Sequence, residues 1–319
     1  MKSSTDRLSD FPVSFFSVTM GIAGLALAAA SAEELLGFPF GSDVLGFVAF
    51  VVFMATTLAY AMKLSRFPAQ VRAEFDDPVR LHFFFTFPIG LILLSSAFID
   101  LSFETAVAFW TVGTVVDLVL TFAIVSIWIR NDKFHPDHLN PSWFLPVVGN
   151  ILIPMAGAWI FPGSHLWFFF GIGIIFWMIL VTLLFDRTIF HKAMSERLVP
   201  TFLIMIAPPA VGVLSYLALT GSVDPFAYIL YFFSLFLALL FFANLPMFTR
   251  IRFSLSWWAY SFPLSALSVA SAELAIRTGE GYFKSLSLIV FAVAVIVIAN
   301  ISIRTIIHIR KEGVRSIEN

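Results

Sequence analysis

The sequence predicts an all-α integral membrane protein with ten transmembrane helices, arranged as five quasi-repeated helical hairpins. The composition is strongly apolar: of 319 residues, 60% are hydrophobic and 12% are charged, and the mean hydropathy is +0.94. About a quarter of the residues of a soluble protein are charged. The chain also divides into ten apolar runs of close to the ~20 residues that cross a bilayer, and prolines recur in every second run.

The ten runs follow one another without a polar segment long enough for a second domain. We therefore assign residues 12–303 to one transmembrane domain, between an N-terminal tail (1–11) and a C-terminal tail (304–319). The N-terminus lacks a short apolar core with a small-residue cleavage site, so we expect the first run to be a retained span rather than a signal peptide. The predicted spans are Pro12–Ala30, Val44–Leu64, Leu81–Ile99, Thr105–Ile129, Trp143–Phe161, Leu166–Phe185, Val199–Leu219, Phe226–Leu245, Trp257–Ile276 and Phe283–Ile303.

Lysine and arginine are distributed unevenly between the two sides of the predicted bundle. Of the 19 such residues, 17 lie in the tails and in the loops after even-numbered spans, and the other two follow the ninth span. Short cytoplasmic loops hold the positive residues of membrane proteins, so we expect both termini in the cytoplasm. The net charge of −1 gives no basic footprint for nucleic acid. The absence of cysteine excludes disulfides, Cys-ligated metal sites and thiol catalysis.

Prolines distinguish the odd-numbered spans from the even-numbered ones. The odd spans start at intervals of 69, 62, 56 and 58 residues, which indicates a repeated hairpin of one kinked and one straight helix. Proline removes a backbone donor, and hydrocarbon cannot satisfy the freed carbonyl. We therefore expect the odd helices to surround a central pore and the even helices to face lipid or neighbouring subunits; alternatively, the prolines only curve the helices of a solid bundle. The predicted kinks are at Pro88, Pro146, Pro154, Pro208, Pro209 and Pro263.

Hydroxyl groups follow one face of the ninth span. Ser261, Ser265 and Ser268 have the i, i+4, i+7 spacing of a helix face and lie beside Pro263. They could line a conduit, or they could be small polar residues at a helix–helix contact. The odd spans hold no acidic residue in mid-helix, which argues against a cation path. Phe262, between these serines, could close a pore as a hydrophobic constriction, although with 39 phenylalanines in the chain most must be packing residues.

An intramembrane aspartate and a histidine-containing loop are two further candidate functional sites. Asp117 is an acid in the middle of the fourth span, where an ionisable residue is a functional candidate; because that span is even-numbered, we favour a buried contact over proton coupling. His135 and His138, in the loop segment HPDHLNP, have no second histidine cluster to complete a metal site. We expect no metal, no cofactor and no enzymatic activity, because the sequence offers no catalytic cluster.

Six segments, in their order and spacing, resemble the family of bacterial tellurite-resistance (TehA) proteins and plant slow anion channels (SLAC). Two positions differ from the family pattern: family members often have glycine at the position of Ser17, and TehA-like proteins have glycine at that of Pro263. The six segments are FPVSFFSVTMGIAGLALA, SDVLG, VRAEFDDPVR, WFLPVVGNILIPMAG, APPAVGVLSYL and WWAYSFPLSALS.

The resemblance implies a homotrimer in the bacterial inner membrane, with a separate pore inside each protomer. It also implies that Phe262 is the occluding residue and that Ser17 and Val211 line the pore. The expected function is then a passive channel for small inorganic anions, in which nitrate passes at least as well as chloride. The alternative is a proton-coupled secondary transporter for tellurite or C4-dicarboxylates, because the broader family includes carriers of that description.

Overall fold

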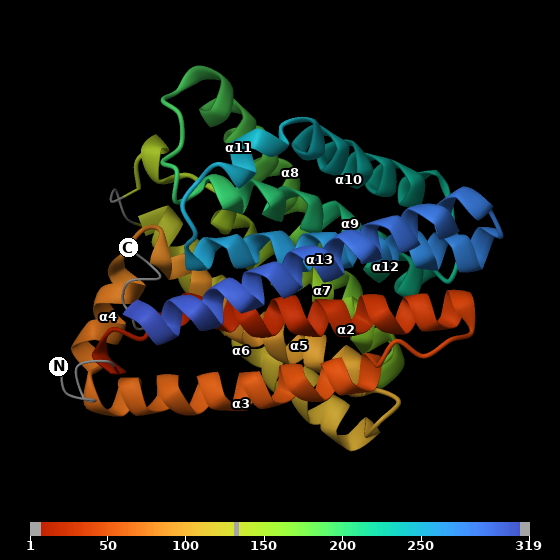
Figure 1. Cartoon of the computed structure of the whole chain (residues 1–319), viewed down its shortest axis with the longest axis horizontal. Helices are drawn as coiled ribbons and strands as arrows, with labels where there is room; N and C mark the ends of the chain where they lie inside the picture. Colours follow the sequence, from red (N-terminus) through yellow and green to blue (C-terminus); the bar gives the residue numbers. More distant parts are fainter. Residues whose placement is uncertain (1–7, 131–133, 313–319) are drawn as a thin grey trace.

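The computed structural model describes residues 8–130 and 134–312, and within these ranges all regular secondary structure is helical. Ten helical segments are long and apolar enough to cross a membrane, as the sequence predicts (Figure 1). The start of the first span and the end of the last lie at the same end of the bundle. This end is called the termini end below, and the opposite one the far end.

The even-numbered spans are continuous α-helices, whereas every odd-numbered span begins with a 3₁₀ segment at the termini end. The odd spans are η1 (Val13–Phe15) with α2 (Phe16–Leu36), η2 (Arg80–Phe85) with α5 (Thr86–Phe98), η4 (Pro141–Phe144) with α7 (Leu145–Ile160), η5 (Val199–Ile206) with α9 (Ala207–Thr220), and η6 (Leu255–Tyr260) with α12 (Ser261–Thr278). The even spans are α3 (Ser42–Arg66), α6 (Phe103–Arg130), α8 (Leu166–Phe190), α10 (Pro225–Ala243) and α13 (Gly281–Glu312). The loops carry α4 (Pro68–Asp76), η3 (Pro136–His138) and α11 (Leu245–Thr249).

Five of the six predicted kink prolines mark the change from 3₁₀ to α geometry. They occupy the second or third position of α5, α7, α9 and α12, where a proline cannot donate the bond that would continue the α-helix across the junction. The sixth, Pro154, lies inside α7. The repeated departure from regular helix is therefore the 3₁₀ segment at the start of each odd span rather than a bend in its middle.

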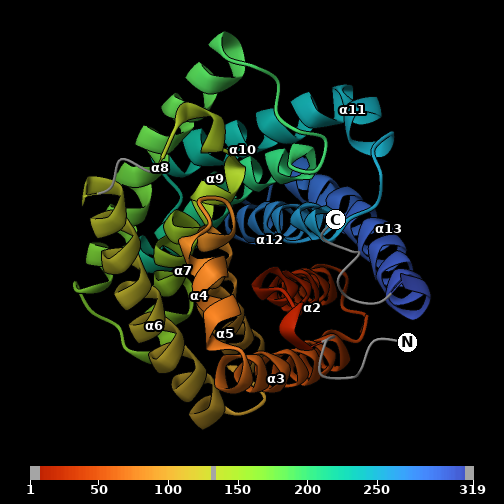
Figure 2. The same ribbon diagram turned by 90° about the vertical axis from the view of Figure 1, so that its left-hand side faces the viewer.

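The odd-numbered spans form a closed inner ring. Each inner helix contacts the next one in the chain: α2 contacts α5, α5 contacts α7, α7 contacts α9 and α9 contacts α12. The ring is closed by the contact between α12 and α2. Each even span packs against the inner helix before it and the one after it, so that consecutive spans form five hairpins around the ring (Figure 2). In the most apolar stretch of each span, 67–78% is buried inside the protein for the inner spans and 22–39% for the outer spans. The division that the prolines predict is thus present in the fold.

The outer helices present large apolar side chains to their surroundings. Phe47 on α3, Val119 on α6, Ile229 on α10 and Ile296 on α13 are each at least 60% exposed. Because a soluble protein does not expose so many such residues in continuous bands, this surface suits the hydrocarbon of a bilayer.

Short turns at the far end close the hairpins. α2, α9 and α12 each end at a glycine with a left-handed backbone, and Gly221, with φ 71°, is the one after α9. Asp224 then caps α10 by accepting from the backbone N–H groups of Phe226 and Ala227. The hydroxyl of Tyr216 donates to the same carboxylate at 2.5 Å and holds the pKa of Asp224 below its usual value.

A buried ion pair ties the start of the first span to the α3–α4 connection. The ammonium Nζ of Lys63 lies 2.9 Å from the carboxylate of Glu74 and donates to the backbone carbonyl of Phe11 at 2.7 Å. The hydroxyl of Tyr60 donates to the second oxygen of Glu74 at 2.8 Å. With all these groups paired, the charges are tolerated at the edge of the bundle.

The last helix extends past the predicted end of the membrane domain at residue 303. α13 continues to Glu312, because Ile306, Ile307 and Ile309 prolong its apolar pattern. Of the predicted tails, residues 1–7 and 313–319 lie outside the described residues.

Candidate functional site

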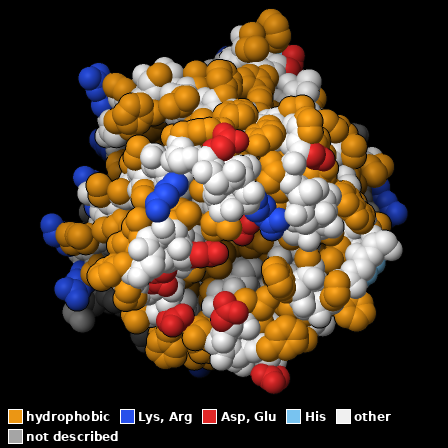
Figure 3. All heavy atoms as spheres, turned by 90° about the vertical axis from the view of Figure 1, so that its right-hand side faces the viewer, with side chains coloured by type: hydrophobic (Ala, Val, Ile, Leu, Met, Phe, Trp, Pro, Cys, Tyr) orange, Lys and Arg blue, Asp and Glu red, His pale blue; other side chains and the backbone are white. Residues whose placement is uncertain are grey.

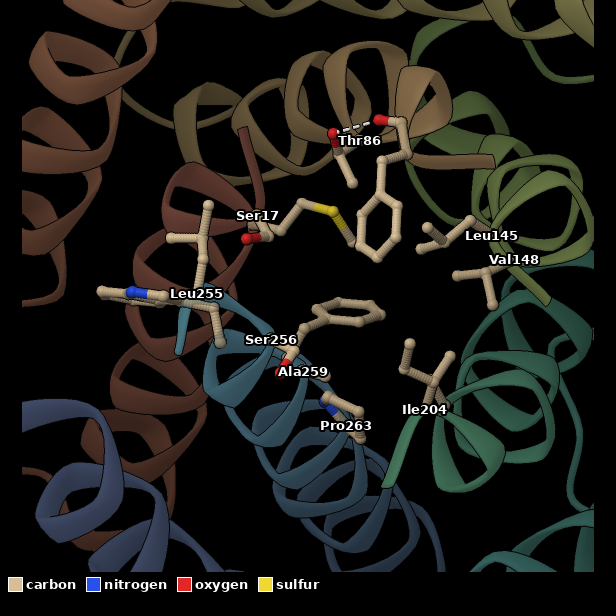
Figure 4. Close-up of a pocket in the computed structure, with 14 residues that line it drawn as sticks. Ser17, Thr86, Leu145, Val148, Ile204, Leu255, Ser256, Ala259 and Pro263 are labelled. Atoms are coloured by element: carbon tan, nitrogen blue, oxygen red, sulfur yellow. Dashed lines mark hydrogen bonds between the residues drawn. The ribbon is translucent and has the colours of Figure 1, made fainter. Parts of the chain in front are cut away.

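A cavity lies inside the ring, near the 3₁₀ ends of the inner spans. All five inner spans contribute to its wall (Figure 4). Ser17 on α2, Thr86 on α5, Val148 on α7, Ile204 on η5 and Pro263 on α12 lie around this common space. We call it the upper cavity. Its wall is apolar except for a few hydroxyl groups.

A second, smaller cavity lies deeper in the ring, toward the far end. It is again lined from all five inner helices, which contribute Gly24, Leu93, Leu152, Val211 and Ala266 among other residues. We call it the lower cavity. The two cavities follow one another along the inside of the ring.

Phe262 is the one described residue that lines both cavities. It is the second residue of α12, and its side chain is 6% exposed. A β-carbon built at Gly24 would stand 3.1 Å from its Cδ2 atom, so the ring packs closely against α2 at a position that has no side chain. The phenyl ring therefore separates two spaces that are lined by the same five helices.

The upper cavity adjoins a vestibule at the termini end. The vestibule shares Phe83, Leu255 and Ser256 with the upper cavity. Arg80, at the start of η2, and Arg197, before η5, both line it. None of the described residues that line the vestibule or either cavity is acidic. Two fixed positive charges at a mouth attract anions and repel cations.

The far end carries the opposite charge. Arg277 and Lys284 are the basic residues there, and Arg277 is engaged with Glu273 at 2.9 Å and with the carbonyl of Gly221. Acidic side chains accordingly outnumber basic ones near the centre of this face (Figure 3). They are Glu33, Glu34, Asp43, Asp100, Glu104, Asp224, Glu273 and Glu280.

Two of the five predicted pore-lining residues, Ser17 and Val211, line the two cavities, one on either side of Phe262. Ser17 lines the upper cavity, where its hydroxyl donates to the carbonyl of Ser14 at 2.7 Å. Val211 on α9 lines the lower cavity. The spacing of residues in the sequence does not indicate that Ser17 or Val211 lies near Phe262. Both positions follow from the resemblance to the family.

The serine stripe of α12 lies in helix–helix contacts and lines neither cavity. Ser261 and Ser265 donate to carbonyls of their own span, at 2.6 and 3.2 Å, and pack against α2 at Gly21 and Gly24. Ser268 faces α13. All three are fully buried. In this structure the three hydroxyl groups therefore lie at helix–helix contacts, with Ser261 and Ser265 against α2 and Ser268 against α13.

Asp117 is buried where α6 packs on α7. Its carboxyl group touches Gly149, where a β-carbon would collide with it, and neither oxygen has a hydrogen-bond partner among the described residues. The neighbouring Asn150 donates to Thr121 at 2.8 Å and to the carbonyl of Pro146. Asp117 does not line either cavity or the vestibule.

The described residues hold no group of three or more histidine, cysteine or acidic side chains that could bind a metal ion. His135 and His138 lie on the loop around η3, with ring centroids 5.5 Å apart. Neither Arg80 nor Arg197 is singled out by the sequence analysis. Arg80 ends the segment VRAEFDDPVR, but nothing in the sequence indicates that a residue more than a hundred positions later stands beside it.

Comparison with known proteins agrees with this arrangement. The profile of a family described as voltage-dependent anion channel (SLAC1) matches residues 10–306. The chain belongs to this family. A tellurite resistance protein TehA homolog from Haemophilus influenzae is 30% identical over 310 residues, which cover 94% of this chain and 91% of that protein.

The plant members of the family are similar over the same length of this chain. The S-type anion channel SLAH3 of Arabidopsis thaliana is 27% identical over 93% of the chain, and the guard cell S-type anion channel SLAC1 of the same plant is 24% identical over 93%. The chain spans about half the length of these plant relatives, at 48% and 56%. The similarity therefore concerns the membrane domain that it shares with them.

Proposed function

We propose that this protein is a passive channel for small monovalent anions, with Phe262 as its gate. The observation that carries the proposal is the position of one phenyl ring between two cavities that the same five helices enclose. A bulky apolar ring in a narrow passage excludes water and blocks an ion sterically. The relatives named as anion channels support the choice of ion class.

The wall of the conduit suits weak and transient contact with an anion. Arg80 and Arg197 concentrate anions in the vestibule. The upper cavity beyond offers a few hydroxyl groups, the lower cavity is apolar, and neither is lined by a charged residue among those described. Conduction requires binding weak enough for the ion to leave. An ion that sheds water easily enters such a passage most readily, so nitrate passes at least as well as chloride.

The same proposal includes the setting of the protein. The protein lies in a bacterial inner membrane, and the excess of basic residues at the termini end favours the cytoplasmic side for that end. The vestibule then opens to the cytoplasm. The exposed apolar surface of the outer helices faces lipid and the neighbouring subunits of a homotrimer in which each protomer has its own conduit.

The second candidate is a proton-coupled secondary transporter for tellurite or C4-dicarboxylates. Asp117 favours it, since a buried acid without partners is a place where a proton could bind. Against it stands the position of Asp117 on an outer helix, away from the cavities.

Flux from proteoliposomes separates the two candidates. The protein is reconstituted, and efflux of chloride, nitrate and succinate is measured with and without an imposed pH gradient. If the protein is a channel, we expect the flux of chloride and nitrate to depend on the electrical potential and not on the pH gradient. Saturable succinate or tellurite uptake driven by the pH gradient would establish the transporter instead.

A further inference from the structure

A deep apolar groove opens on the outer surface between α10, α11 and α13. Phe241 on α10, Phe248 on α11 and Val297 on α13 form its walls, and Tyr260 and Leu264 of the η6–α12 span form its floor. An inner span is therefore reached from the outside here, at the two positions that flank Phe262 and Pro263.

Two arginines, Arg252 and Arg304, adjoin residues that line the termini end of this groove. The indole of Trp257, which lines the groove, donates to the backbone carbonyl of Arg252 at 3.2 Å and lies 5.4 Å beneath the guanidinium of Arg304. Arg304 also donates to the side chain of Asn300, another lining residue, at 2.9 Å. Both arginines are exposed, and neither has an acidic partner within salt-bridge distance among the described residues.

The dimensions of the groove match one leaflet of a bilayer. Its α13 residues run from Val293 to Ile301, which is about 12 Å at 1.5 Å per residue. Arg304 lies about one turn further, and half of a ~30 Å hydrocarbon core is about 15 Å. The groove thus has about the length of one hydrocarbon leaflet, and Arg304 lies about one turn of α13 beyond its last lining residue.

We propose that this groove binds an anionic phospholipid. Its acyl chain lies against Phe241 and Val297, and its phosphate accepts hydrogen bonds from Arg252 and Arg304. Arginine suits a phosphate because its planar guanidinium donates two parallel hydrogen bonds, and basic pockets between membrane helices are known to select anionic headgroups. The bound lipid touches the outer side of the span that carries Phe262. A site of this kind is independent of which ion the protein conducts.

The test compares lipid retention in matched variants of the full chain. Each protein is purified in mild detergent with a mixture of phosphatidylglycerol and phosphatidylcholine, and retained lipid is measured by native mass spectrometry. Arg252→Gln/Arg304→Gln removes the headgroup contacts, and Ala238→Trp fills the groove. Arg66→Gln/Arg130→Gln is the control, since both residues are exposed at the same end but on α3 and α6.

Wild type and control retain phosphatidylglycerol in preference to phosphatidylcholine if the proposal holds. The arginine pair then binds phosphatidylglycerol about tenfold more weakly, and Ala238→Trp loses it as well. Equal retention in all four proteins would overturn the proposal, and so would an equal loss in the control pair, which would indicate surface charge alone.

A single-cysteine variant identifies any occupant directly, because the chain has no cysteine of its own. A photocrosslinker on Ala238→Cys, activated in native membranes, adds the mass of one phospholipid if the groove holds lipid. Capture of a second copy of the chain would show that the groove is a protomer interface and would contradict the proposal.

Discussion

Gly24 on α2 lies directly against the ring of Phe262 on α12. A β-carbon at Gly24 would stand 3.1 Å from Cδ2 of Phe262 and 3.2 Å from Cβ of Ser265. The closed arrangement therefore depends on a glycine at this position as well as on the ring. In the proposed channel, these two residues are the opposing surfaces of the gate.

Gly24→Ala is predicted to increase anion current. The added methyl group crowds the ring in its closed position, and overpacking of about 1 kcal/mol shifts a closed–open equilibrium about fivefold toward the open state. Whole-cell current of the variant measures this shift. In a Phe262→Ala background the same substitution has no ring to displace, so an equal increase there would separate Gly24 from the gate.

Arg80→Gln/Arg197→Gln is predicted to lower unitary chloride conductance at low salt. The vestibule loses both positive charges that concentrate anions at its mouth. In 1 M salt the Debye length is about 3 Å, so the difference from wild type largely disappears. Single-channel recording at the two salt concentrations checks this, with Arg66→Gln as a control far from the vestibule. A reduction that is independent of salt would argue for a structural role.

Asp117→Asn is predicted to leave anion current unchanged. The substitution keeps the shape of the side chain and removes the ionisable group from a site that touches neither cavity. Flux in proteoliposomes with and without a pH gradient provides the measurement. Abolished transport in a normally folded variant would favour proton coupling and the transporter.

Lys63→Met is predicted to destabilise the protein by about 3–5 kcal/mol, because it leaves the buried carboxylate of Glu74 without its cation. Thermal unfolding in detergent would show a lower midpoint. The double variant Lys63→Met/Glu74→Leu removes both charges and recovers most of the loss. If the single and the double variant have the same unfolding midpoint, the loss of the ion pair is not the cause of the destabilisation.

The ten spans and their division into an inner and an outer set could be predicted from the sequence. Apolar runs of sufficient length specify the spans, and prolines are tolerated only where protein covers the backbone. The 3₁₀ segments could not be predicted, because a short run such as VPTFLIMI at η5 is apolar throughout and gives no period to distinguish i+3 from i+4 bonding. The sequence prediction ended α13 at residue 303 because the uninterrupted apolar run stops at Arg304. The helix continues to Glu312, with isoleucines between the basic residues.

The candidate site was predictable only in part. Resemblance to a family singled out Phe262, Ser17 and Val211, and the cavities give these positions a common geometry. The hydroxyl stripe from Ser261 to Ser268 could not be interpreted without knowing that Gly21 and Gly24 bring α2 into contact with it. Arg80 and Arg197 line the same vestibule because of the way in which distant loops meet. No local sequence pattern indicates this.

The most direct test of the gate compares anion currents of wild type, Phe262→Ala and Phe202→Ala at equal surface expression. Phe202 is a buried phenylalanine of an inner span that lines none of the three spaces, so it controls for loosened packing. A large current, in nitrate and in chloride, that appears only in Phe262→Ala is the result we predict. Equal currents in the two alanine variants, or none in either, would contradict the assignment of Phe262 as the gate.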